Sequence, residues 1–442
     1  MSGRVPPRAG WLVAVIPLLL TATSGPGPRR GTGPADTLTS AYEVAGVRVI
    51  QRLNQANDII AVRLYLLGGT QQLTPRSAGI EALLLRASSQ GTAQFPGEDA
   101  HRAMDRTGSV VTLDPDVDWT VFGFTGLVAD LDAAWRVFAD RVVHPTLAEA
   151  AVARERTRLL SAARRRYTEP DLRLHAIAMQ ALFRDHPYAL DPAGTEASLA
   201  GLTAEEVRTY HREQVVTSRM LLVVVGEITR AHVESLVTAT LGQLPRGRYH
   251  WTLPPLAPER EVAWLIQQRP IPTAYMLGLF AGPRPTSRYY WAFRVATALL
   301  SSGLNSTIRT ERGLSYAAYA PYDECAIPVG GVYASTPKPD KVLPLMVREM
   351  QLLSEREYDY FALQRFIDSF SFEYLSANAT AAGQADFLAR AELYLGSYES
   401  GADFTKRLHE VSPADIQGVA GQYMTRIQYA FLGDTARMHG RW

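Results

Sequence analysis

Two long stretches of this chain are built alike, and this internal repeat constrains the fold more than any other feature. Apolar strand-like runs ending in small residues, I-I-A-V-R-L-Y-L-L-G-G-T and A-Y-M-L-G-L-F-A-G-P, occupy residues 59–70 and 274–283. Each half also ends in a capped helical pattern followed by a short apolar run, at residues 202–227 and 411–434. A period of roughly 200 residues is that of a domain rather than a solenoid unit, so the sequence predicts two tandem homologous domains.

The segment between the halves, L-P-R-G-R-Y-H-W-T-L-P-P-L-A-P, is rich in proline and glycine and indicates a linker. We therefore predict an N-terminal domain at residues 40–243, a linker at 244–260 and a C-terminal domain at 261–442. Hairpin-like strand pairs such as V-V-T-L-D-P-D-V-D-W-T-V-F stand between longer helical runs. This pattern predicts an α+β fold in which each domain is a mixed, mostly antiparallel sheet covered by helices.

The N-terminus has the pattern of a secretory signal peptide. Arg4 and Arg8 precede the apolar run W-L-V-A-V-I-P-L-L-L, and small residues follow it. We expect residues 1–24 to be the signal peptide and residues 25–39 a flexible leader. A secretory signal peptide predicts an extracytoplasmic protein, periplasmic or extracellular. The apolar run is short for a membrane span, so we expect no stable span after cleavage.

The balance of charge argues against a polyanionic partner. The 45 Lys and Arg residues nearly equal the 44 Asp and Glu residues, so the net charge is +1. The basic run at residues 164–166 falls in a helical pattern and indicates a solvated helix face. Nothing in the composition therefore points to nucleic acid.

Cys325 is the single cysteine, which excludes an internal disulfide and favours a buried apolar role.

A motif near the start of the first half carries a resemblance to a known family. Residues 79–92 read G-I-E-A-L-L-L-R-A-S-S-Q-G-T, which resembles the G-L-x-H-x-x-E-H-x-x-x-x-G-T segment of the pitrilysin/insulinase family of inverted zinc peptidases. Gly79, Gly91 and Thr92 keep the register. The segments H-P-Y, G-T-E and V-V-V-G-E follow in the order found in the family, although a lone histidine such as His186 is usually structural. The resemblance implies the repeated domains of that family, arranged as half of a clamshell.

The residues that carry the family's chemistry are missing. In the family register the two zinc-binding histidines fall on Ala82 and Arg86, and the general-base glutamate falls on Leu85. The third ligand falls on Ala162, while the auxiliary Glu155 is kept. A hydrolytic zinc site needs three protein ligands and an open water position. We therefore expect no cofactor and no catalytic residue in this chain, and no peptidase activity by the chain alone.

The family's peptide-docking strand is altered as well. Where the family usually shows G-G-x-x-N-A-x-T, residues 108–115 read G-S-V-V-T-L-D-P. That strand is an edge that takes substrate by β-addition in the family. Pro115 lacks a backbone donor, so peptide docking at this edge is weakened.

A second family signature is kept. Residues 301–316, S-S-G-L-N-S-T-I-R-T-E-R-G-L-S-Y, resemble the family's R-x-x-x-x-G-L-x-Y segment, with Arg309 and Tyr316 at its polar positions. In the family the arginine holds a substrate carbonyl and the tyrosine donates to the oxyanion. The alternative is that Arg309 caps or salt-bridges its helix and that Tyr316 is a half-buried strand residue.

The resemblance implies a divided enzyme. The family includes heterodimers in which one subunit carries zinc and the other the substrate-facing pair, as in mitochondrial processing peptidases. We interpret this chain as the zinc-less subunit, with a partner that carries H-x-x-E-H and zinc, acting on unfolded peptides. A structural or peptide-binding pseudopeptidase with no catalytic partner is the alternative. An active enzyme of another chemistry is disfavoured because no nucleophile-and-base arrangement is recognisable.

Overall fold

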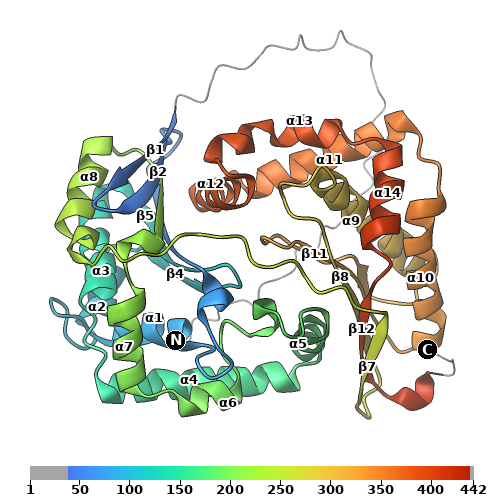
Figure 1. Cartoon of the computed structure of the whole chain (residues 1–442), viewed down its shortest axis with the longest axis horizontal. Coiled ribbons are helices and arrows are strands. Elements are labelled where there is room, and N and C mark those ends of the chain that lie inside the picture. Colours follow the sequence, from blue (N-terminus) through green and yellow to red (C-terminus); the bar gives the residue numbers. More distant parts are fainter. Residues whose placement is uncertain (1–37, 439–442) are drawn as a thin grey trace, which may run out of the picture.

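The computed structural model describes residues 38–438, which form two sheets surrounded by helices (Figure 1). The predicted α+β class is confirmed: each half of the chain contributes a mixed, mostly antiparallel sheet. The predicted signal peptide at residues 1–24 and nearly all of the predicted leader lie outside the described residues. The first strand begins at Thr39, the last residue assigned to the leader, because Thr39 already pairs with Arg52. Within residues 38–438 no helix is long and apolar enough to cross a membrane.

The first sheet has the strand order β1-β2-β6-β3-β5-β4. All neighbouring pairs are antiparallel except β2 and β6, which are parallel. Its strands are β1 (Thr39–Val44), β2 (Val47–Leu53), β3 (Ile59–Leu67), β4 (Val110–Pro115), β5 (Trp119–Leu127) and β6 (Met220–Gly226).

The second sheet has the order β7-β12-β8-β11-β10, which repeats β2-β6-β3-β5-β4 of the first sheet without a strand in the place of β1; β9 also pairs with β11. Here β12 and β7 form the parallel pair. Its strands are β7 (Ala263–Gln268), β8 (Ala274–Ala281), β9 (Ala317–Tyr319), β10 (Tyr322–Asp323), β11 (Val329–Thr336) and β12 (Gln428–Gly433). Residues 245–262, between the two sheets, contain no helix or strand.

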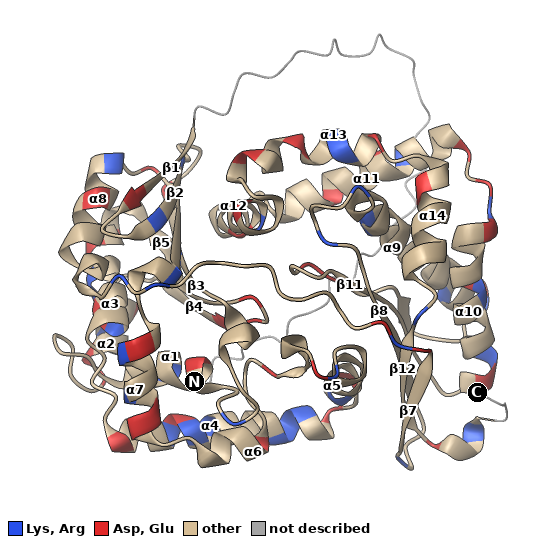
Figure 2. Ribbon diagram, viewed as in Figure 1, with Lys and Arg blue, Asp and Glu red and all other residues tan. Residues whose placement is uncertain are grey.

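Fourteen α-helices of the described chain surround the sheets. They are α1 (Ile80–Ala87), α2 (Asp99–Arg106), α3 (Leu131–Val143), α4 (Glu149–Thr168), α5 (Pro170–Leu182), α6 (Glu196–Gly201), α7 (Ala204–Gln214), α8 (Arg230–Ala239), α9 (Tyr290–Leu304), α10 (Pro339–Glu355), α11 (Tyr360–Ala377), α12 (Ala381–Leu395), α13 (Phe404–His409) and α14 (Pro413–Tyr423). The basic run at residues 164–166 lies on α4, which carries several basic residues (Figure 2). Arg164 pairs with Glu196, and Arg166 pairs with Asp191.

The repeat is visible in how each half ends. Thr203 caps α7 and Ser412 caps α14, each within a capping box completed by the residue three positions later. A central strand follows both helices, and every residue of β6 and β12 is buried. A strand that is buried on both faces reads as a continuous apolar run, and such a strand needs cover on both sides of its sheet.

That cover is exchanged between the halves. Helix α5 of the first half packs on β8 and β12, and α12 of the second half packs on β3 and β6 (Figure 1). The buried side chains of α12 join Tyr65 and Val223 in one apolar cluster, and those of α5 join Leu277 and Leu432 in another. The sequence predicted two helix-covered domains, but apolar periodicity does not reveal whose sheet a helix will cover.

A buried carboxylate ties the halves together further. Asp118, in the β4–β5 turn, accepts hydrogen bonds from Tyr188 (2.5 Å), from Tyr394 (2.7 Å) and from the backbone N–H of Ala326 (2.8 Å). Two of these donors belong to the second half. Burial raises the pKa of Asp118 to about 6, although the three hydrogen bonds oppose that rise.

Candidate functional site

The glycines of the degenerate motif keep a structural purpose. Gly79 precedes α1 with φ +87°, a left-handed conformation that favours glycine. A Cβ on Gly79 would lie 2.7 Å from the Cα of Gly194, so the backbones of these two residues approach closely. The scaffold that positions α1 is therefore retained although the chemistry of the motif is lost.

Two of the family's zinc-site positions on α1 are occupied by apolar core residues. Ala82 and Leu85 are 3% and 8% exposed and belong to the apolar core of the first half. Arg86 is exposed, and Ala162 is half-buried on α4, the helix that packs against α1. Glu155 is buried and accepts a hydrogen bond from Arg158 at 2.5 Å. In residues 38–438 no three His, Cys, Asp or Glu side chains come together to hold a metal, and the residues at the motif do not fit zinc.

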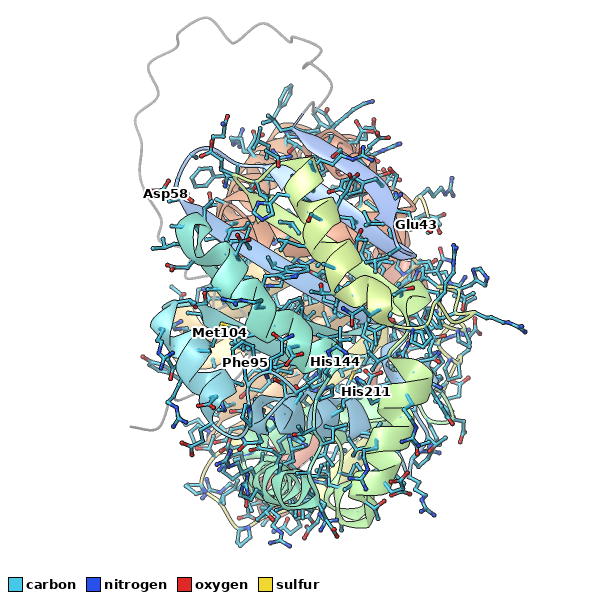
Figure 3. All side chains as sticks on the ribbon, turned by 90° about the vertical axis from the view of Figure 1, so that its left-hand side faces the viewer. Glu43, Asp58, Phe95, Met104, His144 and His211 are labelled. Carbon is cyan, nitrogen blue, oxygen red and sulfur yellow. The ribbon has the colours of Figure 1, made fainter. Side chains whose placement is uncertain are left out.

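Two histidines of the first half, His144 and His211, lie near each other at the ends of α3 and α7 (Figure 3). His211 donates from Nε2 to the carbonyl of Val142 at 2.8 Å, and burial lowers its pKa. His144 lies 3.1 Å from Asp140 through Nδ1. These rings are engaged within the fold. His186 is engaged likewise, because its Nδ1 accepts from the N–H of Tyr188 and its Nε2 bonds to a backbone carbonyl, in keeping with a structural role.

A buried ion pair on α1 was not predicted from the sequence. Glu81 is 1% exposed and accepts hydrogen bonds from Arg219 (2.9 Å), from Tyr210 (2.6 Å) and from Thr120. Arg219 also donates twice to the carbonyl of Leu67, at 2.9 and 2.7 Å. The available signals were one acidic residue within an apolar helical run and one arginine at the start of an apolar strand, because charges in such places need partners.

Arg141 of α3, which contacts the C-terminal end of α1, was also not predicted from the sequence. It is 5% exposed, donates to the carbonyl of Leu85 at 3.3 Å and stacks over Phe122. Burial lowers its pKa to about 10. A cation at the last turn of a helix complements the helix dipole, so Arg141 stabilises α1 at the position where the family has its general base.

In the second half, the structure brings Arg309 and Tyr316 together. Helix α9 continues into the π-helix η7 (Asn305–Thr310), which carries Arg309, and Gly313 then turns the chain with φ +58°. Ser315 anchors the turn by donating to the carbonyl of Ser335 at 2.8 Å. The guanidinium carbon of Arg309 lies 5.1 Å from the centre of the Tyr316 ring, a cation–π contact.

Both side chains are otherwise uncommitted. Tyr316 is 86% exposed and Arg309 is exposed. Within residues 38–438 neither one has an ion-pair or hydrogen-bond partner, so the arginine does not bridge its helix and the tyrosine is not half-buried. The substrate-binding role of the pair stays a prediction. Arg309 and Tyr316 lie in the second half and α1 lies in the first.

The structure supports the reasoning about Pro115. Strand β4 is the outer strand of the first sheet, and the N–H of Asp116 bonds to the carbonyl of Trp119 at 2.8 Å. Because bonding alternates along an antiparallel pair, Pro115 and Thr120 form a non-hydrogen-bonded pair, and the backbone of Pro115 faces outward. The missing donor therefore belongs to the free edge.

Comparisons with known proteins agree with this arrangement. Residues 48–196 match the family Insulinase (Peptidase family M16), and residues 201–365 match the Peptidase M16 inactive domain. An uncharacterized zinc protease of Mycobacterium leprae is 28% identical over 295 residues, which cover 63% of this chain and 64% of that protein. The chain thus spans a little under two thirds of that relative's length.

Two solved structures share the fold. A protease from Helicobacter pylori superposes with a TM-score of 0.81 at 17% identity, covering 89% of this chain and 99% of the other. A peptidase M16 inactive domain from Pseudomonas fluorescens also gives 0.81 at 19% identity, with 90% and 98% covered. The motif order, the two family matches and the common two-sheet architecture together show that the chain belongs to the M16 (pitrilysin/insulinase) peptidase family.

Proposed function

We propose that this protein is the zinc-less subunit of a two-subunit M16 peptidase and that it presents Arg309 and Tyr316 to the substrate. One observation carries the proposal: the pair sits in cation–π contact on an anchored turn, exposed and with no other side-chain partner among residues 38–438. Exposed on this turn, the guanidinium and the phenol hydroxyl both have free donors to offer a bound peptide.

The chemistry of the pair suits peptide hydrolysis. A guanidinium donates to a substrate carbonyl, and a tyrosine hydroxyl donates to the oxyanion that forms in the transition state. Neither group supplies a nucleophile, and α1 offers no ligand or base at Ala82, Leu85 and Arg86. The nucleophilic water would come from the H-x-x-E-H site of the partner. Substrates would be unfolded peptides, and the N-terminal sequence pattern suggests an extracytoplasmic location.

Assembly with a zinc-bearing M16 subunit is the first test. The two proteins, mixed and sized on a column, should form a complex whose peptidase activity exceeds that of the partner alone. If the assembled complex is no more active than the partner alone, the structural pseudopeptidase is favoured.

The second test uses variants in the assembled complex. Tyr316→Phe should lower kcat by about 10²–10³, the cost typical of losing one oxyanion donor. Arg309→Ala should chiefly raise KM, because it removes binding common to the ground and transition states.

Tyr360→Phe and Arg136→Ala are matched controls, because both side chains are exposed and lie outside the turn that carries the pair. Both controls should leave the kinetics unchanged. If Tyr316→Phe and Arg309→Ala also behave as wild type in an intact complex, the pair is structural and the proposal fails.

A further inference from the structure

The repeat leaves one sheet edge without its counterpart. In the first sheet β1 pairs antiparallel with β2 and covers its outer edge. The strand of the second sheet that corresponds to β2 is β7. It pairs with β12 on one side, and no strand among residues 38–438 lies on its other side. Accordingly β2 is largely buried, whereas Ile266 of β7 is 49% exposed.

The direction of the β7 backbone follows from its bonding to β12. The N–H of Arg269 donates to the carbonyl of Gly433 at 2.8 Å, in register with the parallel pairing of the two strands. Alternate residues of a strand in a parallel pair bond to the neighbour, so residues 267 and 265 face β12 like 269. The N–H and C=O groups of Ile266 therefore face outward, available to a further strand.

An open groove of about 650 Å³ runs along this edge. One wall is β7, and the other is a single face of α5 with the residues that follow it. Its lining residues are Arg173, Ile177, Gln180, Ala181, Arg184, Asp185, Ala189, Leu265, Ile266 and Gln267. An extended chain placed here would bond to β7 and contact the aliphatic side chains of α5.

The charges of the groove select the occupant. Arg184 is exposed and has no acidic partner among the described residues. Arg173 donates to the neutral Gln267 at 3.0 Å and stacks over Tyr167, so its charge is also uncompensated by an acid. Asp185, the one acidic lining residue, lies 3.5 Å from Arg260. The groove thus carries net positive charge beside an edge on which no strand of residues 38–438 lies.

We propose that β7 and α5 form a peptide-binding groove that takes an extended, acidic segment by β-addition, antiparallel to β7 as β1 is to β2. Main-chain bonds to Ile266 give affinity, while Arg173 and Arg184 select carboxylate side chains. This site is separate from Arg309 and Tyr316 and does not depend on the function proposed for them.

Fluorescence anisotropy with the full chain tests the groove. The probe is a fluorescein-labelled peptide of alternating valine and glutamate, long enough to pair along all of β7. Ile266→Pro removes an outward donor together with the Ile266 side chain that lines the groove, and it should weaken binding about fivefold or more, at least the effect of one backbone hydrogen bond. Arg184→Glu should weaken it about tenfold or more, because it places like charge against the peptide.

Matched controls separate the groove from general effects. Arg136→Glu changes another exposed arginine, on α3, and should leave binding unchanged. Circular dichroism should show that Ile266→Pro keeps the wild-type Tm, whereas Leu265→Pro, on the inward-facing register, lowers it.

The proposal is overturned if the two groove variants bind the probe as wild type does, or if a probe with lysine or with N-methylated alternate residues binds equally well. Concentration-dependent dimers that Ile266→Pro abolishes would instead assign the edge to a second copy of this chain. Peptidase assays of the assembled complex are independent of these outcomes.

Discussion

Replacing Glu81 by alanine should be among the most destabilising single changes in the first half. Glu81 and Arg219 have side chains 2% and 1% exposed, and they join α1 to the start of β6. Removing the carboxylate leaves the Arg219 charge buried, and it strips an acceptor from Tyr210 and Thr120. The resulting cost is that of an uncompensated charge in an apolar core.

The magnitude follows from what Arg219 retains. Breaking a buried pair costs about 3–5 kcal/mol. Arg219 keeps its two bonds to the carbonyl of Leu67 and one to that of Gln214 at 3.1 Å, which favours the lower end of this range. A loss of about 3 kcal/mol corresponds to a fall in Tm of roughly 6–12 °C for a unit of some 200 residues.

Urea and thermal unfolding followed by circular dichroism measure this loss. Glu234→Ala is the matched control, because Glu234 pairs with Arg230 at 2.6 Å on the surface of α8, where such a pair contributes about 0.5 kcal/mol or less. The double variant Glu81→Leu with Arg219→Met should recover most of the stability, since it removes both charges. A loss for Glu81→Ala as small as that of the control would refute the reasoning.

Two further predictions concern the lost metal site and the buried Asp118. The wild-type chain should retain no stoichiometric zinc after dialysis, as measured by metal analysis. A fourfold variant that restores three ligands and the base should bind about one zinc per chain; its changes are Ala82→His, Leu85→Glu, Arg86→His and Ala162→Glu. A folded variant without zinc would show that the register is wrong. Because the folded pKa of Asp118 is raised to about 6, above its unfolded value near 3.9, the folded state binds more protons between these values. The free energy of unfolding of the wild type, relative to that of Asp118→Asn, should therefore be greatest below pH 4. It should fall by about 2–3 kcal/mol as the pH rises to 6 and stay level above it, as measured by urea unfolding across pH. Parallel pH profiles for the two proteins would contradict the shift.

Much of the architecture was predictable from local pattern. The paired apolar runs at residues 59–70 and 274–283 became the central strands β3 and β8, because a short continuous apolar run that ends in small turn residues reports strand position without reference to distant contacts. The buried partnership of Glu81 and Arg219 was not predictable, since 138 positions separate them. Only the strand order of the sheet brings the two residues together.

The sequence by itself determined that the chain has two similar halves and that its motif cannot hold zinc, because ligand chemistry resides in side-chain identity and no folding can supply a missing donor. It also placed Arg309 and Tyr316 on either side of one glycine turn. Tertiary structure alone decided that α5 and α12 cross to the opposite sheets, that Asp118 joins the halves, and that no described strand covers the outer side of β7. Apolar periodicity specifies which face of an element is buried, whereas its partner depends on how all the elements share the available sheet surface.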